Sequence, residues 1–428
     1  MTRRVLRDLS EMVSELWLSH KIVANNLKRR AVAHHSRVSG KPTPSGLDFV
    51  VYKTISSVPL DIWDGCNRDN DIFLSSDYLL ALEQAPPANM QFRYVIFTNK
   101  GNPVAIGYFQ ILTLNHRLHR PAMHFLRMRK RTIISDFHTK IADTISHHIL
   151  VCGNALLSGE HGYAAAVSDE NQVIHALAEA AYAIRKSAEN HISVILIKDF
   201  YDRSTRKANV LSLFGYYPFD AGPNIIVPIS ENWTSFDEYL KQMKAKYRKR
   251  ATSAIKKGAA IHRQTLNLDE ITEHKDALYA LYSEVVDKSK LRLFFLSPDY
   301  IIGLKKNIGD QFVCDGYFEG ENIIGFTTRI INGHTMEGYT HGMRYEQNKT
   351  YELYQNFLLD DIKAAITAKC SQINTGRTSI AMKSSVGGVP DNMKCYIRST
   401  GRLSNQLIKP LFCVIKPSYE YCRHPFEK

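Results

Sequence analysis

Acidic, phenolic and imidazole side chains alternate along the segment EGYTHGM, residues 337–343. An extended strand places alternate residues on one face, so Glu337, Tyr339 and His341 are expected to project together, with Thr335 before them. A carboxylate or an imidazole within hydrogen-bonding reach can take a proton from an attacking amine. The pattern therefore predicts a catalytic group in which Glu337 or His341 is the base and Tyr339 lies beside it.

The residues that follow, RYEQNKTYELYQNF (344–357), are expected to begin a helix near Thr350. The first N–H groups of a helix have no partner within it, and they lie at the positive end of its dipole. N–H groups between residues 342 and 354 are therefore the expected oxyanion or carrier donors, with Tyr351, Tyr354 and Gln355 as binding side chains. The alternative is a polar strand edge whose two tyrosines belong to the core.

A glycine-rich turn with two cations follows the next expected strand, in NTGRTSIAMKSSVGGVP, residues 374–390. Arginine can grip a carboxylate or phosphate through two N–H groups, whereas lysine acts as a point charge. Arg377, Lys383 and Ser384 are therefore expected to bind the anionic part of a carrier or acceptor. The alternative is a solvated loop.

A basic amphipathic segment occupies residues 233–263 and is expected to form one helix followed by the strand AAIHRQTL. Nine Lys or Arg residues and no acidic residue lie between Lys241 and Arg263. Tyr247 and Arg248 are the residues of this helix expected to contact an anionic substrate or carrier. An ordinary helix with a solvated basic face is the alternative. Its apolar stripe is Phe236, Leu240, Met243, Tyr247, Ala251, Ala254 and Ile255.

This succession of Phe, Tyr, a Lys/Arg-rich helix, glycine and a strand resembles the opening of the acyl-transfer domain in the FemABX-like branch of the GNAT acyltransferase superfamily. The Gly-Arg turn followed by Lys-Ser at 383–384 resembles the same branch. The resemblance implies a bacterial transferase of cell-envelope or lipid biosynthesis. The glycine-rich diphosphate loop of GNAT enzymes is missing here, which fits relatives that use other acyl carriers.

The order of expected elements repeats, and this repetition defines the fold class. Strand, helices, antiparallel strands, helix and strand occur over 47–230 and again over 231–428. We therefore expect an α/β (α+β) protein of two tandem GNAT-like units, each a mixed sheet flanked by helices. Residues 1–46 are expected to form a separate basic amphipathic helix and linker.

Two further basic segments suggest anionic partners. Residues 5–30 read as an amphipathic helix, and residues 114–131 interleave bulky apolar side chains with arginines. Residues 5–30 are expected either to lie on an anionic membrane surface or to pack on the body of the protein. Residues 114–131 are expected to contact a membrane surface or the backbone of transfer RNA, and the alternative for them is a solvated loop. The expected location is the cytoplasm, with peripheral contact at the inner membrane face. The sequence makes no prediction of oligomeric state.

Composition narrows the function classes. The 428 residues carry a net charge of +13 and contain no long apolar run that would span a membrane. Seven cysteines without a CxxC spacing favour free thiols over disulfides or zinc. Cys152, before Gly153, is interpreted as a buried strand thiol more than as a nucleophile. Nucleotide-binding, kinase, HExxH and GxSxG motifs are missing, and no metal site is expected.

These observations favour an N-acyltransferase in which an amine attacks the acyl carbonyl of an acyl-CoA-type thioester directly. No cofactor is expected beyond acyl-CoA as co-substrate. An aminoacyl-tRNA-dependent transferase acting on an envelope or lipid precursor is one alternative. A non-catalytic binding protein on a GNAT-like scaffold is the other, because a fold alone does not confer activity.

Overall fold

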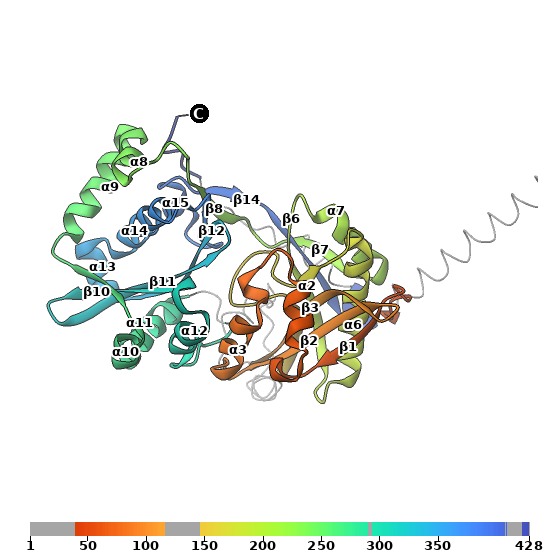
Figure 1. Ribbon diagram of the computed structural model, residues 1–428. Helices are drawn as coiled ribbons and strands as arrows, with labels where there is room; N and C mark the ends of the chain where they lie inside the picture. The colour runs from red at the N-terminus through yellow and green to blue at the C-terminus, as the bar shows by residue number, and fades with distance from the viewer. Residues whose placement is uncertain (1–38, 116–145, 290–292, 407, 409–421, 428) are drawn as a thin grey trace, which may run out of the picture.

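The computed structural model describes residues 39–115, 146–289, 293–406, 408 and 422–427. These residues form two β-sheets that lie next to each other, each with its own helices (Figure 1). The first half of the chain contains β1 (Asp48–Tyr52), η1 (Ile55–Ser57), α2 (Leu60–Cys66), η2 (Ile72–Leu74), α3 (Ser76–Gln84), β2 (Met90–Asn99), β3 (Asn102–Asn115), β4 (Ser146–Cys152), β5 (Tyr163–Ala165), α6 (Glu170–Ser187), β6 (Ile192–Tyr201), α7 (Thr205–Ala208), η3 (Asn209–Phe214), β7 (Tyr217–Asp220) and β8 (Asn224–Pro228). The second half contains α8 (Phe236–Gln242), α9 (Ala245–Gly258), β9 (His262–Leu266), α10 (Leu268–Glu273), α11 (Lys275–Lys288), α12 (Tyr300–Ile308), η4 (Gly309–Gln311), β10 (Phe312–Glu319), β11 (Asn322–Asn332), β12 (Thr335–Met343), α13 (Tyr345–Tyr351), α14 (Leu353–Thr367), β13 (Gln372–Asn374), α15 (Ile380–Ser384), β14 (Val389–Asp391) and β15 (Met393–Ser399).

The first sheet has the strand order β1-β2-β3-β4-β6-β15-β7, with β5 paired to β3. Among the described strands of this sheet, the only parallel pair is β4 with β6, and α6 makes the crossover between them. The helix begins after Asp169, whose side chain accepts the N–H of Gln172. Its apolar face packs on the sheet through Val173, Leu177 and Ile184, so α6 covers one face of the sheet.

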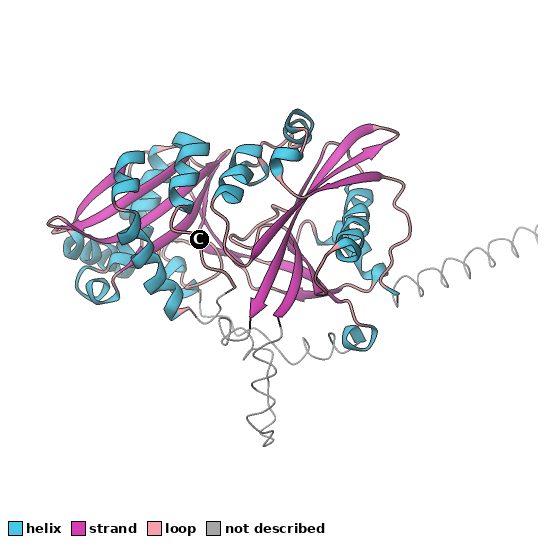
Figure 2. Cartoon of the chain, turned by 90° about the horizontal axis from the view of Figure 1, so that it is seen from below, coloured by secondary structure: helices cyan, strands magenta, loops and turns pink. Residues whose placement is uncertain are grey.

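The second sheet has the order β14-β8-β13-β12-β11-β10-β9 and repeats this plan. Its parallel pair is β12 with β13, connected through α14. Helices α8, α9 and α14 pack on one face, and α11 and α12 pack on the other. Figure 2 shows helices on both sides of these strands.

A continuous apolar core joins the two halves. Helix α3 packs on α12, and Tyr78 and Phe73 of the first half share one cluster with Tyr300 and Phe326 of the second. A polar contact at the edge of this interface links Asn307 to Gln84 at 3.1 Å. Both halves of the chain therefore contribute to the interface between the two sheets.

Each sheet is completed by a strand from the other half, which the sequence did not predict. Strand β8 pairs with β13 and β14 in the second sheet, although residues 224–228 lie within the expected first unit. Strand β15 pairs with β6 and β7 in the first sheet. The tandem organisation of mixed sheets flanked by helices is confirmed, and the exchange of β8 and β15 ties the two sheets together.

The basic segment forms two helices, so the prediction of one helix over 233–263 is wrong. Helix α8 begins after Ser235, which accepts the N–H of Glu238, and it ends at Gln242. Arg248 of α9 then donates to the carbonyl oxygens of Lys241 (2.9 Å) and Met243 (3.1 Å) at the break. These bonds satisfy the carbonyl groups left free where α8 ends.

The remaining expectations concern the two basic segments, membrane spans, the cysteines and metal ions. The expected helix at 5–30 and most of the basic segment at 114–131 lie outside the described residues. Within the described residues, no helix combines the length and apolarity needed to cross a bilayer. The cysteines of this part of the chain are unpaired, and no cluster of His, Cys, Asp and Glu there is arranged for a metal ion.

Candidate functional site

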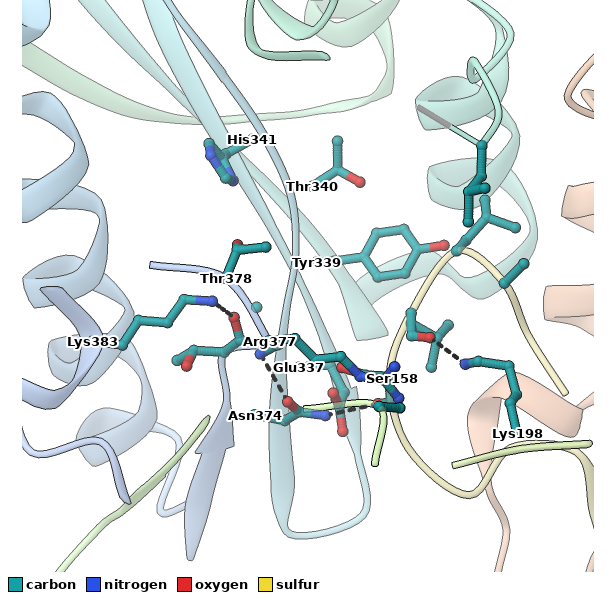
Figure 3. Close-up of a pocket in the computed structure, with 18 of the residues that line it drawn as sticks. Ser158, Lys198, Glu337, Tyr339, Thr340, His341, Asn374, Arg377, Thr378 and Lys383 are labelled. Carbon is teal, nitrogen blue, oxygen red and sulfur yellow. Dashed lines mark hydrogen bonds between the residues drawn. The ribbon is translucent and has the colours of Figure 1, made fainter. Parts of the chain in front are cut away.

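A cavity of about 840 Å³ lies between the two sheets. Both halves of the chain line it: the second half contributes most of the polar residues, and the first half contributes most of the aliphatic ones together with Ser158, Lys198 and Asp220. Figure 3 shows the polar part, with Lys383 and Thr378 on one side of β12 and Lys198 on the other. The lining residues used below are Leu112, Ile149, Val151, Ala155, Leu156, Leu157, Leu196, Lys198, Glu337, Gly338, Tyr339, Thr340, His341, Tyr354, Phe357, Asp361, Asn374, Arg377, Thr378, Lys383 and Cys395.

The cavity exists because β12 and β13 pair over only a short length. Their register runs from Thr335 with Gln372 to Glu337 with Asn374, and pairing then stops. The first side chains beyond the last pair, from Gly338 to His341, border the cavity. Parallel strands that diverge in this way open a space at the carboxyl end of the sheet for a ligand.

A β-bulge in β12 changes the side to which its side chains point. Gly338 lies opposite Arg329 and His341 lies opposite Thr327, so β12 has one more residue than β11 between these pairs. Thr328 fixes the bulge, because its hydroxyl accepts the Thr340 N–H at 2.9 Å and donates to the Thr340 carbonyl at 2.8 Å. Simple alternation ends at this point.

The bulge corrects the expectation that Glu337, Tyr339 and His341 share one face. Tyr339 packs toward η2 and α12, where its ring contacts Phe73 and Tyr300. His341 points instead toward α14, with its ring 5.4 Å from that of Tyr354 (Figure 3). All three side chains still border the same cavity, because it extends to both sides of β12.

Glu337 is a buried carboxyl group suited to proton transfer. It is 7% exposed and hydrogen-bonds to Asn374. Burial raises the pKa of Glu337 to about 8, although nearby His161 opposes this change. A carboxylate with such a pKa is a stronger base than an exposed one and is ionised in part near neutral pH.

His161 and Asp71 lie behind Glu337, outside the cavity lining. The Nδ1 atom of His161 is 2.7 Å from Asp71 Oδ2. Burial alone would lower the pKa of His161, but Asp71 and Glu337 together raise it. The imidazolium form of His161 is therefore stabilised next to the Glu337 carboxyl group.

His341 and Tyr339 differ from Glu337 in their proton chemistry. Burial, with a smaller contribution from Lys383, lowers the pKa of His341 to about 4, so its imidazole is neutral at physiological pH. The Tyr339 hydroxyl is hydrogen-bonded to Tyr300 and, at 2.9 Å, to Tyr78. Burial raises the pKa of Tyr339 far above its ordinary value, so this residue forms the wall of the site as a neutral phenol.

Arg377 borders the cavity but is already paired. Its guanidinium contacts Asp199, which also contacts Lys198. Burial alone would raise the pKa of Asp199, but Lys198 and Arg377 together lower it to about 2. Arg377 therefore compensates a buried carboxylate, and its charge is not free to neutralise a phosphate.

Lys383 borders the cavity on the α14 side and is buried. It donates to the Thr375 carbonyl oxygen, and burial lowers its pKa to about 7. Its neighbour Ser384 points away from the cavity and accepts the Arg423 N–H at 3.0 Å. Of this predicted group, Arg377 and Lys383 reach the cavity and Ser384 does not.

Backbone N–H groups in the segment predicted to bind a carrier, at the start of the helix, already have hydrogen-bond partners. The Tyr345 N–H donates to Glu284 at 3.0 Å, and the Tyr354 N–H donates to Asn348 at 2.9 Å. Glu352 immediately precedes α14 and forms an ion pair with Lys257. The carboxylates of Glu284 and Glu352 would repel a diphosphate at this location. The anionic part of a carrier must therefore be placed elsewhere.

The remaining predicted binding residues are dispersed. Tyr354 borders the cavity, whereas Tyr351 hydrogen-bonds to Glu319 away from it. Gln355 is buried within α14, and Tyr247 packs in the core between α9 and α14. Arg248 is exposed, apart from its bonds at the end of α8. Among these residues, only Tyr354 lines the cavity.

The sequence reasoning missed Asp361, which is 6% exposed and borders the cavity. Burial raises the pKa of Asp361 to about 7 despite the opposing effect of Arg329. Its Oδ1 atom has no hydrogen-bond partner within the described residues. A signal was present, since Asp361 follows Phe357 by four residues on the apolar face of a helix, where an acid is unusual.

No family model matches the chain, and no curated protein sequence matches it. The structure is similar to that of FemX, with a TM-score of 0.51 at 10% identity over 80% of this chain and 98% of that one. Two weaker similarities have 10% identity and cover 83% of this chain. One is to the C-terminal domain (DUF2156) of a putative lysylphosphatidylglycerol synthetase from Agrobacterium fabrum, with a TM-score of 0.46 over 96% of that chain. The other is to a tandem GNAT protein of the clavulanic acid pathway, with a TM-score of 0.48 over 99% of that chain. The similarity to FemX supports the predicted tandem GNAT-like fold.

Proposed function

We propose that the protein is an acyltransferase that moves an acyl group from an acyl-CoA-type thioester to an amine. The observation that carries the proposal is the buried Glu337 carboxyl group, with its raised pKa, in the cavity where β12 and β13 diverge. The FemX-like fold is consistent with this reading but does not by itself specify a reaction.

The proposed reaction is a direct attack. The amine nitrogen forms a bond to the thioester carbonyl carbon, and the carbon–sulfur bond breaks when the tetrahedral intermediate collapses. Ionised Glu337 accepts the proton of the amine, and the departing thiolate is protonated. Cys395 also borders the cavity, but burial raises its pKa to about 12, which disfavours a covalent thioester on the enzyme.

The donor is placed on the α14 side of β12, next to Thr378, Lys383 and Tyr354. We assign the anionic part of its carrier to the exposed basic face of α9. Arg250 of this helix lies 3.1 Å from the sulfur of Met382, the residue that precedes Lys383. Acyl-CoA serves as co-substrate, and the reaction requires no other cofactor.

A second candidate, transfer from an aminoacyl-tRNA, is favoured by one specific observation. The cations of α9, including Lys246, Lys249 and Arg250, are exposed, and no acidic residue lies between Lys241 and Arg263. A surface of this kind suits the phosphate backbone of RNA. Binding to transfer RNA would then weaken steeply as salt increases.

Thiol release tests the proposal. The protein is incubated with acetyl-CoA, decanoyl-CoA or decanoyl-pantetheine and a mixture of primary amines, and N-acyl products are identified by mass spectrometry. Glu337→Gln is compared with Glu160→Gln, which alters a partly buried carboxyl of raised pKa outside the main cavity lining. Product formation that only Glu337→Gln abolishes supports the proposal. Consumption of aminoacyl-tRNA without use of any thioester would replace it with the second candidate.

A further inference from the structure

One continuous part of the cavity lining, on the first sheet, consists of aliphatic side chains; the polar residues of the first half that also line the cavity are Ser158, Lys198 and Asp220. Leu112 and Ile149 are directly paired on β3 and β4, and Val151 and Leu196 are directly paired on β4 and β6. The intervening Leu150 points to the opposite face, where it packs in the core beneath α6. The four side chains therefore form one apolar floor that crosses three neighbouring strands.

The loop that follows β4 forms an apolar wall beside this floor, through Ala155, Leu156 and Leu157. Two of its backbone N–H groups have partners that do not line the cavity. Buried Gln110 accepts the Ala155 N–H at 2.7 Å, and buried Asn154 accepts the Leu156 N–H at 3.0 Å. The loop thus offers the cavity its side chains and leaves these N–H groups satisfied.

Lys198 also lines the cavity, and its ammonium group already has partners. Its ammonium group donates to the carbonyl oxygens of Asn154 (2.8 Å) and Leu157 (2.7 Å) and pairs with Asp199. The lysine therefore fixes the loop. A charged or strongly polar ligand group placed here would lose its hydration. It would find no unoccupied partner on the strand floor, on the side chains of the loop wall or at Lys198.

Four of these apolar side chains are only partly buried, because no described segment covers them on the cavity side. They are Ile149, Leu156, Leu157 and Leu196. Contiguous apolar surface of this kind marks a binding site for an apolar ligand. The region is continuous with the space beside Glu337 and Thr340, so a ligand held there can extend to the proposed reaction centre.

We infer that this region, defined by Leu112, Ile149, Val151, Leu156, Leu157 and Leu196 and called here the apolar arm, holds a linear alkyl chain of fatty-acyl length. The inference rests on the proposed acyltransferase function and specifies its substrate class. A chain without branches or polar groups can lie along the flat floor formed by the paired strand residues. The chain belongs either to the acyl donor or to a lipid-like amine, and the two sources require separate measurements.

The test measures affinity as a function of chain length by calorimetry on the full-length protein. The donor series is acetyl-, hexanoyl-, decanoyl- and palmitoyl-CoA, and the acceptor series is butylamine, octylamine and dodecylamine. Burial of each methylene is expected to increase affinity about fourfold until the arm is filled. A rise in the first series assigns the arm to the donor, and a rise only in the second assigns it to the acceptor.

Two variants locate the effect. Leu196→Trp fills the floor, and Leu156→Trp, in a loop, provides a second variant if the strand substitution impairs folding. Each is expected to lower the ratio of long-chain to short-chain affinity at least tenfold. Leu213→Trp is the control, because Leu213 is 53% exposed and lies outside the cavity.

The outcomes separate the inference from the proposed function. Acyl-CoA binding or turnover that does not depend on chain length in either series overturns the apolar arm and leaves the acyltransferase proposal in place. Chain-length dependence that neither tryptophan variant alters also overturns the arm. Failure to bind or use any acyl thioester overturns the proposed function, and the inference falls with it.

Discussion

Replacing Glu337 by glutamine should have opposite effects on activity and on stability. The amide keeps the size of the side chain and can still hydrogen-bond to Asn374, but it cannot accept the proton of an amine. Loss of a positioned general base is expected to reduce turnover by about a hundredfold to ten-thousandfold. The same change removes a carboxyl group whose ionisation is unfavourable in the folded protein.

The direction of the stability effect follows from the raised pKa. Below pH 4.5, the ordinary pKa of the side chain, Glu337 is protonated in both the folded and the unfolded chain. Between pH 4.5 and about 8 only the unfolded chain ionises, so the wild-type protein loses stability as pH rises. The variant lacks this loss, and its relative stability should therefore increase with pH and level off above pH 8.

The magnitude has a clear upper limit. A shift from 4.5 to about 8 corresponds to at most about 5 kcal/mol, because each pKa unit is worth about 1.4 kcal/mol. Glu337 borders the open cavity and is not fully enclosed, which reduces this figure, and we expect an advantage of about 1 to 2 kcal/mol above pH 8.

The assay compares thermal unfolding of wild-type protein and Glu337→Gln at pH 5 and pH 9, together with thiol release. The difference in melting midpoint should be small at pH 5 and should favour the variant at pH 9. Glu160→Gln controls for loss of a partly buried carboxyl group of raised pKa outside the main cavity lining and should retain turnover. A Glu337→Gln protein with full activity, or with the same midpoint difference at both pH values, would refute the reasoning.

Three further predictions follow from the neighbouring residues. With an amine that is neutral throughout the range, kcat/KM should rise with pH to a plateau above pH 8, whereas a rise near pH 4 would identify His341 as the base. Asp199→Asn should destabilise the protein by about 3 to 5 kcal/mol in urea unfolding, because Lys198 and Arg377 lose their buried partner, and an unchanged midpoint would contradict this account. Since the pKa of Asp199 is lowered to about 2, the contribution of this cluster is present above pH 3.8 and should be lost as pH falls toward 2. Gly342→Ala should cost about 1 to 3 kcal/mol, because the added Cβ would lie 2.5 Å from the Tyr282 nitrogen, and a wild-type melting midpoint would show that α11 moves freely.

The local patterns of the sequence were sufficient to predict the repeated order of elements. The helical spacing of apolar residues in α6 and α14 records which face of each helix is buried, and that information is local. The partners of β8 and β15 depend on the tertiary arrangement instead. Each is the last described strand of its own half in chain order, yet each pairs with the sheet of the other half.

The site was predicted in part, for similar reasons. Glu337, Tyr339, His341, Tyr354, Arg377 and Lys383 do line one cavity. The bulge at Thr340 could not be predicted from alternation, because it depends on the hydroxyl of Thr328 in the neighbouring strand. The pairing of Arg377 with Asp199 also joins residues far apart in the sequence, so a predicted anion-binding arginine proved to be the partner of a buried carboxylate.

The most direct test of the central claim is a single product analysis. Wild-type protein and Glu337→Gln are incubated with decanoyl-CoA and the mixture of primary amines, and N-decanoyl products and released CoA are quantified by mass spectrometry. The account predicts equal amounts of product and free CoA with wild-type protein and almost none with the variant. Equal product from both proteins, or no product although decanoyl-CoA binds in the cavity, would contradict acyl transfer at Glu337.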